Sequence, residues 1–293
     1  MQQNERLKYL FVINGSAGPK DNNDHAEKIR AFLLERNLDE SIYCLPQQFN
    51  VQQIKEYVTK INPENIIAVG GDGTVTMLAN IAAGTDMALG ILPGGSANGM
   101  AKELGISENI DDALQIIKGD NKKKIDLIKI NDKDFCLHLS DIGLNAHLIK
   151  HFDEGKLRGK LGYALVIFKT LWHKQKMQVN INIDELQIKR NAFMVAFANA
   201  RKYGTGAVIN PEGKLDDGLF EVIIVRTLSI ISLLKMMLKP GTFNPKHIEI
   251  ISCTSVQINT LRKVHFQIDG EYKGKIKNVK AEIKAGAVTM ILP

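Results

Sequence analysis

The stretch from Ile66 to Met77, IIAVGGDGTVTM, limits the possible folds more than any other part of this 293-residue sequence. Ile66–Val69 is a continuous apolar run of the kind found in strands buried on both faces of a parallel sheet. The glycine-rich segment Gly70–Gly73 predicts a tight turn, and Thr74–Ala83 predicts a helix. Free amides at the start of such a helix are suited to bind phosphate.

Asp72 lies inside this glycine-rich turn. Without it, a strand-to-helix turn that binds no ligand is the simpler interpretation of Gly70, Gly71 and Gly73. A carboxylate beside bound phosphates is best explained by a metal ion that both contact, so Asp72 favours a phosphate and metal site.

Two more strands are followed by loops of small residues. Tyr9–Ile13 leads into Asn14–Gly18, and Ala88–Leu92 leads into Pro93–Gly99. Because ligands bind at the carboxyl ends of strands in open α/β sheets, we expect these loops to converge with Gly70–Gly73. The other elements expected here are a strand near Cys44 and Leu45 and helices over His25–Asn37, Val51–Ile61 and Met100–Leu104.

Beyond residue 124 the pattern changes to short strand-like runs separated by turns, which predicts a mainly antiparallel β-sandwich or barrel. These runs are Ile125–Ile130, Phe135–Leu139, Gln178–Ile183, Phe193–Ala198, Leu219–Val225, Ile248–Ser252, Ser255–Asn259 and Val264–Ile268. Helical segments over Leu157–Trp172 and Leu228–Leu238 are expected to pack on this sheet, with contact to lipid as the alternative.

We therefore predict an α/β domain over residues 1–124 and a β-rich domain over residues 125–285. Residues 286–293, which include the apolar run Val288–Leu292, are expected to complete the first domain. The first domain should be doubly wound, because its strands alternate with helices.

The composition indicates a protein with an anionic partner. The formal net charge is +6 and the sequence pI is about 9.0, which suits a nucleotide, an acidic lipid surface or nucleic acid. Nucleic acid is the weakest candidate, because RNA-binding aromatic motifs and zinc fingers are absent. Three scattered cysteines and no bilayer-length apolar run predict a cytoplasmic protein. The run Lys122–Lys124 is expected to be a solvated loop, with contact to anionic headgroups as the alternative.

Several known phosphate-binding motifs are missing, including GxxxxGK[ST], the protein-kinase HRD and DFG elements, and GxGxxG after the first strand. The sequence instead resembles the diacylglycerol kinase and sphingosine kinase catalytic-domain family, especially its bacterial soluble lipid kinases. The matching segments, in family order, are Asn14–Gly18, Gly70–Thr74, Pro93–Asn98, Ile125–Leu127, Gly204–Gly206, Lys214–Leu219 and Asp269–Glu271.

This resemblance implies an NAD-kinase- or phosphofructokinase-like α/β domain and transfer of the ATP γ-phosphoryl group to a lipid hydroxyl. The acceptor is expected to resemble diacylglycerol or sphingosine. The residues that the resemblance places around ATP are Asn14, Gly15, Ser16, Ala17, Gly18, Gly70, Gly71, Gly73, Thr74, Gly95, Ser96 and Asn98.

The resemblance also implies roles for acidic residues. Asp72 and Asp126 are expected to hold Mg²⁺ through water, and Glu271 to act as general base; whether Asp72 is the base instead stays open. A second, structural Mg²⁺ is implied at Asp217 with the backbone carbonyls of Lys214 and Leu219.

Taken without the resemblance, these acidic residues have simpler interpretations. Asp217-Gly218 and Asp269-Gly270 are typical of hairpin turns, and Glu271 fits an exposed strand start.

Two positions depart from the family pattern. Bacterial diacylglycerol kinases carry Asp where this chain has Gly99, and Glu is usual where it has Met77. One alternative is therefore a nucleotide- or lipid-binding regulator with weakened catalysis. Another is a soluble kinase of the NAD kinase type, which shares a GGDG loop.

The resemblance implies a protein that uses ATP and Mg²⁺, acts on a lipid at a membrane surface and associates with that surface peripherally. No nucleic-acid partner is expected. The oligomeric state, including a homodimer, stays open.

Overall fold

The computed structural model describes residues 8–15, 22–35, 42–119, 121–144, 146, 176–203, 207–227 and 246–293. The chain forms two compact units, which we describe separately: unit 1, Met1–Ile125 with Gly286–Pro293, and unit 2, Asp126–Ala285. Some predictions lie outside the described residues, namely those for Ser16, Ala17 and Gly18, for Gly204–Gly206, and for helices over Leu157–Trp172 and Leu228–Leu238. Within the described part, no helix is both long and apolar enough to cross a bilayer.

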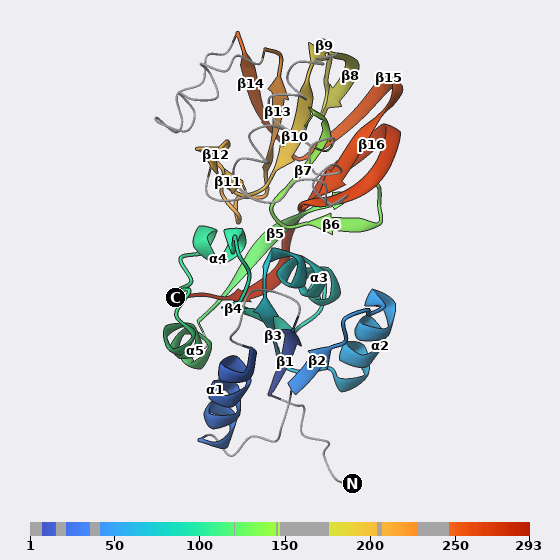
Figure 1. The fold of residues 1–293 in the computed structure, drawn as a ribbon. Helices are drawn as coiled ribbons and strands as arrows, with labels where there is room; N and C mark the ends of the chain where they lie inside the picture. Colours follow the sequence, from blue (N-terminus) through green and yellow to red (C-terminus); the bar gives the residue numbers. More distant parts are fainter. Residues whose placement is uncertain are drawn as a thin grey trace. The chain divides into compact units, whose positions relative to one another are not determined.

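Unit 1 is built on a parallel sheet (Figure 1). Its strands lie in the order β2 (Ile42–Leu45), β1 (Tyr9–Asn14), β3 (Asn65–Gly70), β4 (Ala88–Pro93) and the end of β16 (Glu271–Ile291). Each adjacent pair is parallel. β3 and β4 are buried at every position, which agrees with their continuous apolar sequences.

Helices cover both faces of this sheet. α1 (Asn22–Leu34) contacts α5 (Ile110–Gly119), and α2 (Val51–Ile61) contacts α3 (Asp72–Ala82). Figure 1 shows the two pairs on opposite sides of the strands, so the predicted doubly wound α/β fold is confirmed. The short helix α4 (Gly99–Glu103) follows β4 and contacts α3.

The ends of α2 show why its bounds could be predicted. The Asn50 side chain accepts a hydrogen bond from the Gln52 amide (2.9 Å), which caps the first turn. Asn62 ends the helix in the left-handed conformation, with φ of 48°. Ile54 and Val58, four residues apart, are its buried positions.

The sequence prediction missed α5, although its start carries a recognisable cap. The Asn109 side chain accepts hydrogen bonds from the amides of Asp111 (2.9 Å) and Asp112 (3.3 Å). The buried residues that follow have helical spacing: Ile110, Ala113, Leu114 and Ile117.

Unit 2 is mainly antiparallel β-structure. Its remaining strands are β5 (Lys122–Ile130), β6 (Asp134–Cys136), β7 (Leu139–Gly143), β8 (Met177–Ile183), β9 (Leu186–Ala192), β10 (Met194–Ala198), β11 (Lys202–Tyr203), β12 (Ala207–Val208), β13 (Phe220–Val225), β14 (Ile248–Cys253) and β15 (Ser255–Ile268). Neighbours follow the order β14, β13, β10, β7, β15 and β16, with β15 also pairing with β8, and β8 with β9.

The core of unit 2 is formed by alternate residues of these strands. Phe197 from β10, Phe220 and Val222 from β13, and Val179 and Ile181 from β8 are fully buried in one apolar cluster. Side chains from several strands thus meet in one interior, as predicted for a sandwich.

The hairpin of β15 and β16 has a two-residue turn. Asp269 and Gly270 have φ of 46° and 87°, so the turn predicted from Asp-Gly is confirmed. Two predicted strands, Ser255–Asn259 and Val264–Ile268, are one strand with an irregular register between Asn259 and Val264. That irregularity explains why the sequence pattern looked interrupted.

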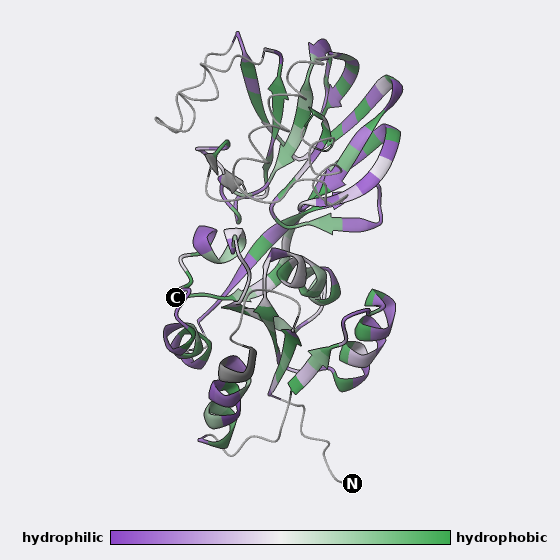
Figure 2. Ribbon diagram, in the orientation of Figure 1, coloured by the Kyte–Doolittle hydropathy of each residue, from purple (hydrophilic) through white to green (hydrophobic). Residues whose placement is uncertain are grey.

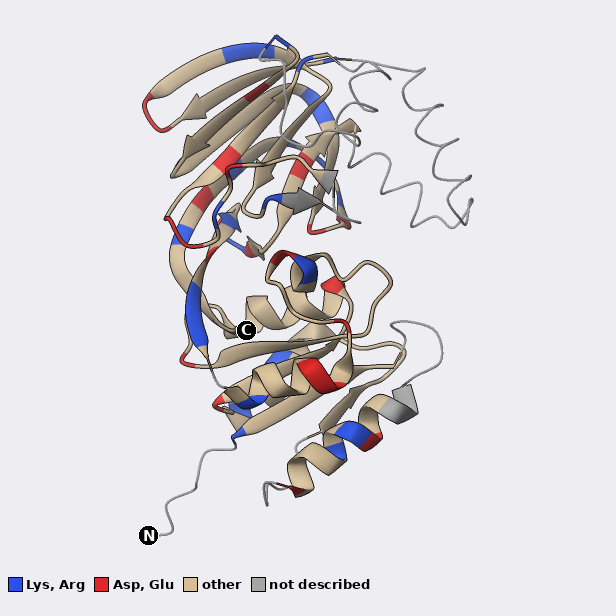
Figure 3. Ribbon diagram, turned by 90° about the vertical axis from the view of Figure 1, so that its left-hand side faces the viewer, with Lys and Arg blue, Asp and Glu red and all other residues tan. Residues whose placement is uncertain are grey.

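One further prediction needs correction, and two strands were missed wholly or in part. Lys122–Lys124 is not a loop but the exposed start of β5, which can be followed in Figure 3. β9 was missed. Most of β16 was missed too, because its alternating lysines and glycines give little apolar signal; Figure 2 shows the mixed hydropathy along it.

Deletion of residues 288–293 is expected to destabilise unit 1. Thr289 and Met290 pair with β4, and Val288, Met290 and Ile291 are buried. Loss of large buried side chains costs about 2–5 kcal/mol each, so a clear fall in the melting temperature by circular dichroism is expected. Deletion of the exposed Pro293 alone serves as the control. Equal melting temperatures of the two shortened proteins would show that residues 288–293 do not stabilise unit 1.

Candidate functional site

The loops after β1 and β3 meet at the carboxyl edge of the unit 1 sheet. The Asn14 amide at the end of β1 donates a hydrogen bond to the Thr74 hydroxyl in the first turn of α3 (3.1 Å). β1 and β3 are neighbours, and the chain continues from β1 to β2 toward one edge of the sheet and from β3 to β4 toward the other edge. This is a topological switch point, where open α/β sheets bind ligands.

The loops after β3 and β4 pack backbone against backbone. The Gly94 amide donates to the Gly70 carbonyl (2.9 Å). A Cβ atom on Gly95 would lie 2.5 Å from the Gly71 Cα atom, and one on Gly70 would lie 2.7 Å from the Thr74 hydroxyl oxygen. Gly95 is therefore required for the close approach of the two loops, and Gly70 leaves room for the Thr74 hydroxyl.

Gly73 differs from the other glycines of the loop. A Cβ atom there would meet no atom within 4 Å, and its φ is not in the left-handed range. The amides of Thr74 and Val75 donate to the Gly71 carbonyl, so those of Asp72 and Gly73 have no acceptor inside α3. The first turn of this 11-residue helix thus has amides without a helical acceptor and a glycine with room around it, an arrangement suited to bind phosphate.

The Asp72 carboxylate links this loop to the start of α4. Its two oxygens accept hydrogen bonds from the amides of Gly99 (2.9 Å) and Met100 (3.0 Å). Each oxygen keeps a further lone pair, which suits a water-mediated contact with Mg²⁺. Among the described residues, no three His, Cys, Asp or Glu side chains cluster to hold a metal ion directly. The donor set fits a magnesium ion held largely by water and phosphate.

Asn98 and Ser96 have different environments. Asn98 is buried with φ of 49°, and its side chain bonds both the amide and the carbonyl of Gly95 (2.9 Å each). It also donates to Glu108, whose pKa is lowered by this hydrogen bond and by Lys102. Asn98 thus shapes the loop, whereas Ser96 is exposed and accessible to a nucleotide.

The two positions that depart from the family pattern lie inside unit 1. Met77 is 9% exposed in α3 and belongs to the apolar core. Gly99 is buried and uses its amide to bind Asp72. Neither residue provides a carboxylate beside the glycine-rich loop Gly70–Gly73.

In unit 2, Asp126 anchors the segment that contains Asp217. Asp126 is 2% exposed; its carboxylate accepts from the Gly218 amide (2.7 Å), and its own amide donates to the Leu215 carbonyl (2.6 Å). Asp217 accepts from the Leu219 amide (3.1 Å), an Asx turn in which Gly218 has φ of 74°. This Asx turn does not join two paired strands, so the hairpin interpretation of Asp217-Gly218 is wrong, and the ligand set of Asp217, Lys214 and Leu219 stays a prediction.

Asp269 has a role that the sequence interpretation missed. Its carboxylate accepts hydrogen bonds from three successive amides, those of Leu137 (2.8 Å), His138 (2.9 Å) and Leu139 (3.0 Å). The next amide, of Gly270, donates to the Gln267 side chain (2.8 Å). These bonds fix the turn that leads directly into Glu271.

Glu271 is the first residue of β16. Its carboxylate is exposed and pairs with Lys273 (2.8 Å). An exposed carboxylate on a fixed turn is accessible to a substrate hydroxyl.

Asn199 was also missed by the sequence analysis. It is fully buried and donates to the carbonyls of Asp126 (2.8 Å) and Leu137 (3.0 Å), which ties the Asp126 strand to the segment that binds Asp269. A lone Asn in the sequence carries no signal for such a role.

Comparison with known proteins gives two family matches. The diacylglycerol kinase catalytic domain matches residues 8–130, and the YegS C-terminal NAD kinase beta sandwich-like domain matches residues 140–292. The proteins named "Probable lipid kinase YegS" from Salmonella schwarzengrund (strain CVM19633) and Salmonella agona (strain SL483) are each 26% identical, over 97% of this chain and 95% of theirs.

Solved structures agree with this result. A "putative diacylglycerol kinase" from Bacillus anthracis str. Sterne has a TM-score of 0.80 and 26% identity, covering 98% of this chain and 97% of its own. An NAD kinase from Archaeoglobus fulgidus in complex with ATP shares the fold, with a TM-score of 0.56, 10% identity and coverage of 97% and 93%. The predicted combination of an NAD-kinase-like α/β domain and a β-sandwich is confirmed. This chain belongs to the diacylglycerol kinase catalytic-domain family of kinases, in the group that carries the YegS-type C-terminal domain.

Proposed function

We propose that this protein is a lipid kinase that transfers the γ-phosphoryl group of ATP to a lipid hydroxyl. The observations that carry the proposal are the first turn of α3, where the Asp72 and Gly73 amides have no acceptor inside the helix, and the Asn14–Thr74 contact that brings the β1 loop to this turn. Gly73 lies in the first turn of α3, where a phosphate that binds the helix amides would come close to the backbone, and the absence of a side chain leaves room for it.

In this proposal, unit 1 binds the nucleotide. The backbones of Gly71 and Gly73 and the side chains of Thr74 and Ser96 contact phosphate, and Asp72 would hold Mg²⁺ through water; the same role is proposed for Asp126, the first residue of unit 2. When bound, Mg²⁺ neutralises the charge that develops on the phosphate oxygens during transfer.

Glu271 is proposed to accept the proton of the acceptor hydroxyl. The hydroxyl oxygen forms a bond to the γ-phosphorus as the bond from that phosphorus to the bridging oxygen breaks, and ADP leaves. The Asp269 hydrogen bonds to Leu137, His138 and Leu139 keep Glu271 in position for this step.

The acceptor class is proposed from the relatives, which are named as lipid or diacylglycerol kinases. We propose a diacylglycerol- or sphingosine-like lipid, reached by peripheral association with a membrane surface. The direct test is incubation of the purified protein with labelled Mg-ATP and a total lipid extract, followed by identification of the labelled lipid. The proposal fails if no lipid is labelled above the background without protein.

A second candidate is a regulator that binds nucleotide but does not transfer phosphate. Buried Met77 and the absent side chain at Gly99 favour it, since both positions lack a carboxylate. Calorimetric binding of ATP with no labelled lipid would support this candidate, and labelled product above background would exclude it.

Gly73→Ala is expected to weaken ATP binding about tenfold or more, a cost of at least about 1.4 kcal/mol. The new methyl group would project from the first turn of α3, whose amides are proposed to contact phosphate. Because alanine favours the helix, the melting temperature should stay the same or rise slightly. Isothermal titration with ATP measures the effect.

Gly119→Ala is the matched control, since a Cβ atom there also meets nothing within 4 Å. Unchanged ATP affinity in Gly73→Ala would show that phosphate does not approach this turn. Gly95→Ala provides the opposite case: its close contact with Gly71 predicts a destabilised loop.

Glu271→Gln is expected to reduce phosphoryl transfer at least about a hundredfold, the usual contribution of a general base. Its melting temperature and ATP affinity should match the wild type, because the carboxylate is exposed. Wild-type turnover in this variant would exclude Glu271 as the base.

Asp269→Ala is expected to lower the free energy of unfolding by several kcal/mol, because three backbone amides lose their charged acceptor. Each hydrogen bond to a charged group contributes about 1.5–3 kcal/mol. Chemical denaturation followed by circular dichroism measures this loss. Wild-type stability would show that water replaces the carboxylate without cost.

A further inference from the structure

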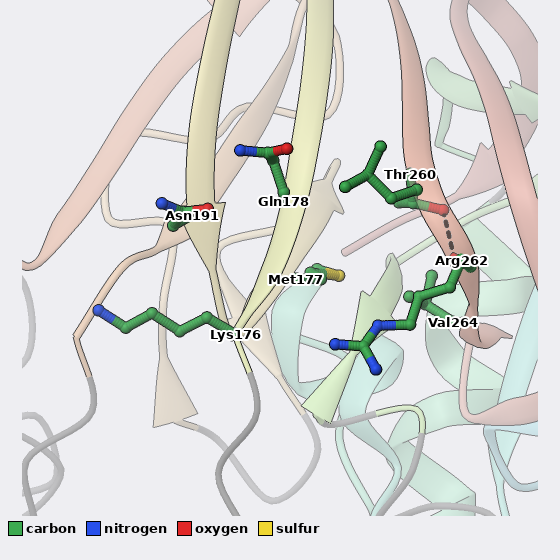
Figure 4. Close-up of a pocket in the computed structure, with 8 residues that line it drawn as sticks. Lys176, Met177, Gln178, Asn191, Thr260, Arg262 and Val264 are labelled. Carbon is green, nitrogen blue, oxygen red and sulfur yellow. Dashed lines mark hydrogen bonds between the residues drawn. The ribbon is translucent and has the colours of Figure 1, made fainter.

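A basic pocket in unit 2 has no part in the proposed phosphoryl transfer. Arg262 contributes a cation, and Gln178 and Asn191 contribute carboxamides; Lys176 also lines the pocket, with its Nζ over the neighbouring Phe193 ring, 5.3 Å from the centroid. Figure 4 shows Lys176 on the side of β8 and Arg262 on the side of β15, with Met177 between them. The described residues that line the pocket include no Asp or Glu, so it is suited to an anionic ligand.

An irregular segment of β15 forms one wall of the pocket. Pairing of β15 with β16 is interrupted between Asn259 and Val264. The Thr260 hydroxyl lies 2.8 Å from the Arg262 carbonyl oxygen and 2.9 Å from the Lys277 carbonyl oxygen, which fixes the segment. Leu261, at its tip, is 68% exposed. A large apolar side chain is thus held in solvent beside a cation.

The adjoining sheet face is rich in carboxamides. Gln178 lies opposite Asn191, and Asn180 lies opposite both Lys189 and Asn259 in the strand register. Residues paired in this way share one face of the sheet. Carboxamides donate to phosphate oxygens and also accept from hydroxyl groups, so they match both parts of a polyol phosphate headgroup.

We propose that this pocket and the Leu261 tip dock unit 2 on a bilayer that contains anionic phospholipid. Lys176 and Arg262 contact the headgroup phosphates, and Leu261 enters the boundary between headgroups and acyl chains. The inference rests on the proposed function, because a kinase for a lipid acceptor must reach a bilayer. Nucleic acid fits less well, since the pocket lining has no aromatic side chain on which a base could stack.

The test measures vesicle binding without ATP and without an acceptor lipid, so its result does not depend on catalysis. Wild-type protein is sedimented with phosphatidylcholine vesicles and with vesicles of equal parts phosphatidylcholine and phosphatidylglycerol. Binding is expected only to the anionic vesicles and should weaken with salt. Arg262→Glu should reduce it about tenfold or more, because each cation near an anionic surface contributes about fivefold. Leu261→Asn should also reduce binding to anionic vesicles, and this reduction should depend less on salt concentration than that of Arg262→Glu.

Lys55→Glu is the control, because Lys55 is exposed on α2 in unit 1 and the change in net charge is the same. Circular dichroism checks that all variants are folded. Three results would each overturn the proposal. Lys55→Glu and Arg262→Glu could lose vesicle binding equally, or Arg262→Glu could bind vesicles as the wild type does. The wild type could also bind a DNA duplex but not vesicles. If the wild type labels a lipid in micelles while Arg262→Glu binds vesicles normally, the docking surface is wrong and the kinase assignment stands.

Discussion

The Asp72 carboxylate is the contact on which the arrangement of unit 1 depends. The loops after β3 and β4 approach so closely that glycine backbones touch, and glycines alone do not hold a loop in one conformation. Asp72 accepts from the first two amides of α4 and so connects the two loops. Hydrogen bonds to a charged group contribute about 1.5–3 kcal/mol each. This carboxylate therefore holds the proposed nucleotide site in shape together with the Gly94–Gly70 backbone bond and the Asn98 side chain.

Unit 2 uses acidic residues in the same way. Asp126 holds the turn at Gly218, and Asp269 holds the segment Leu137–Leu139. In each case an acid from a family motif accepts hydrogen bonds from backbone amides. A loss of activity after removal of one of these acids would therefore combine a structural and a chemical cause. Separation of the two causes requires a stability measurement beside every activity measurement.

The sequence predicted those features whose cause is local. β3 was recognised from its apolar run and the Asp269-Gly270 turn from the two residues themselves; the bounds predicted for α2 agree with the cap at Asn50 and the buried Ile54 and Val58. The acceptor role of Asp269 could not be predicted, because its partner amides lie about 130 residues earlier in the chain. β16 was mostly missed for another reason: much of it is exposed, so lysine replaces the apolar residues that mark a strand.

The path of β16 also affects how unit 1 can form during synthesis. Residues up to 125 of this unit leave the ribosome early, yet the strand beside β4 comes from residues near 290. Until that segment is made, β4 presents a row of unpaired amides and carbonyls, which is the usual template for association with another chain. Its pairing partner arrives only after all of unit 2 has been translated. A nascent chain of this protein therefore depends on its own late residues, or on chaperones, to keep that edge from aggregation.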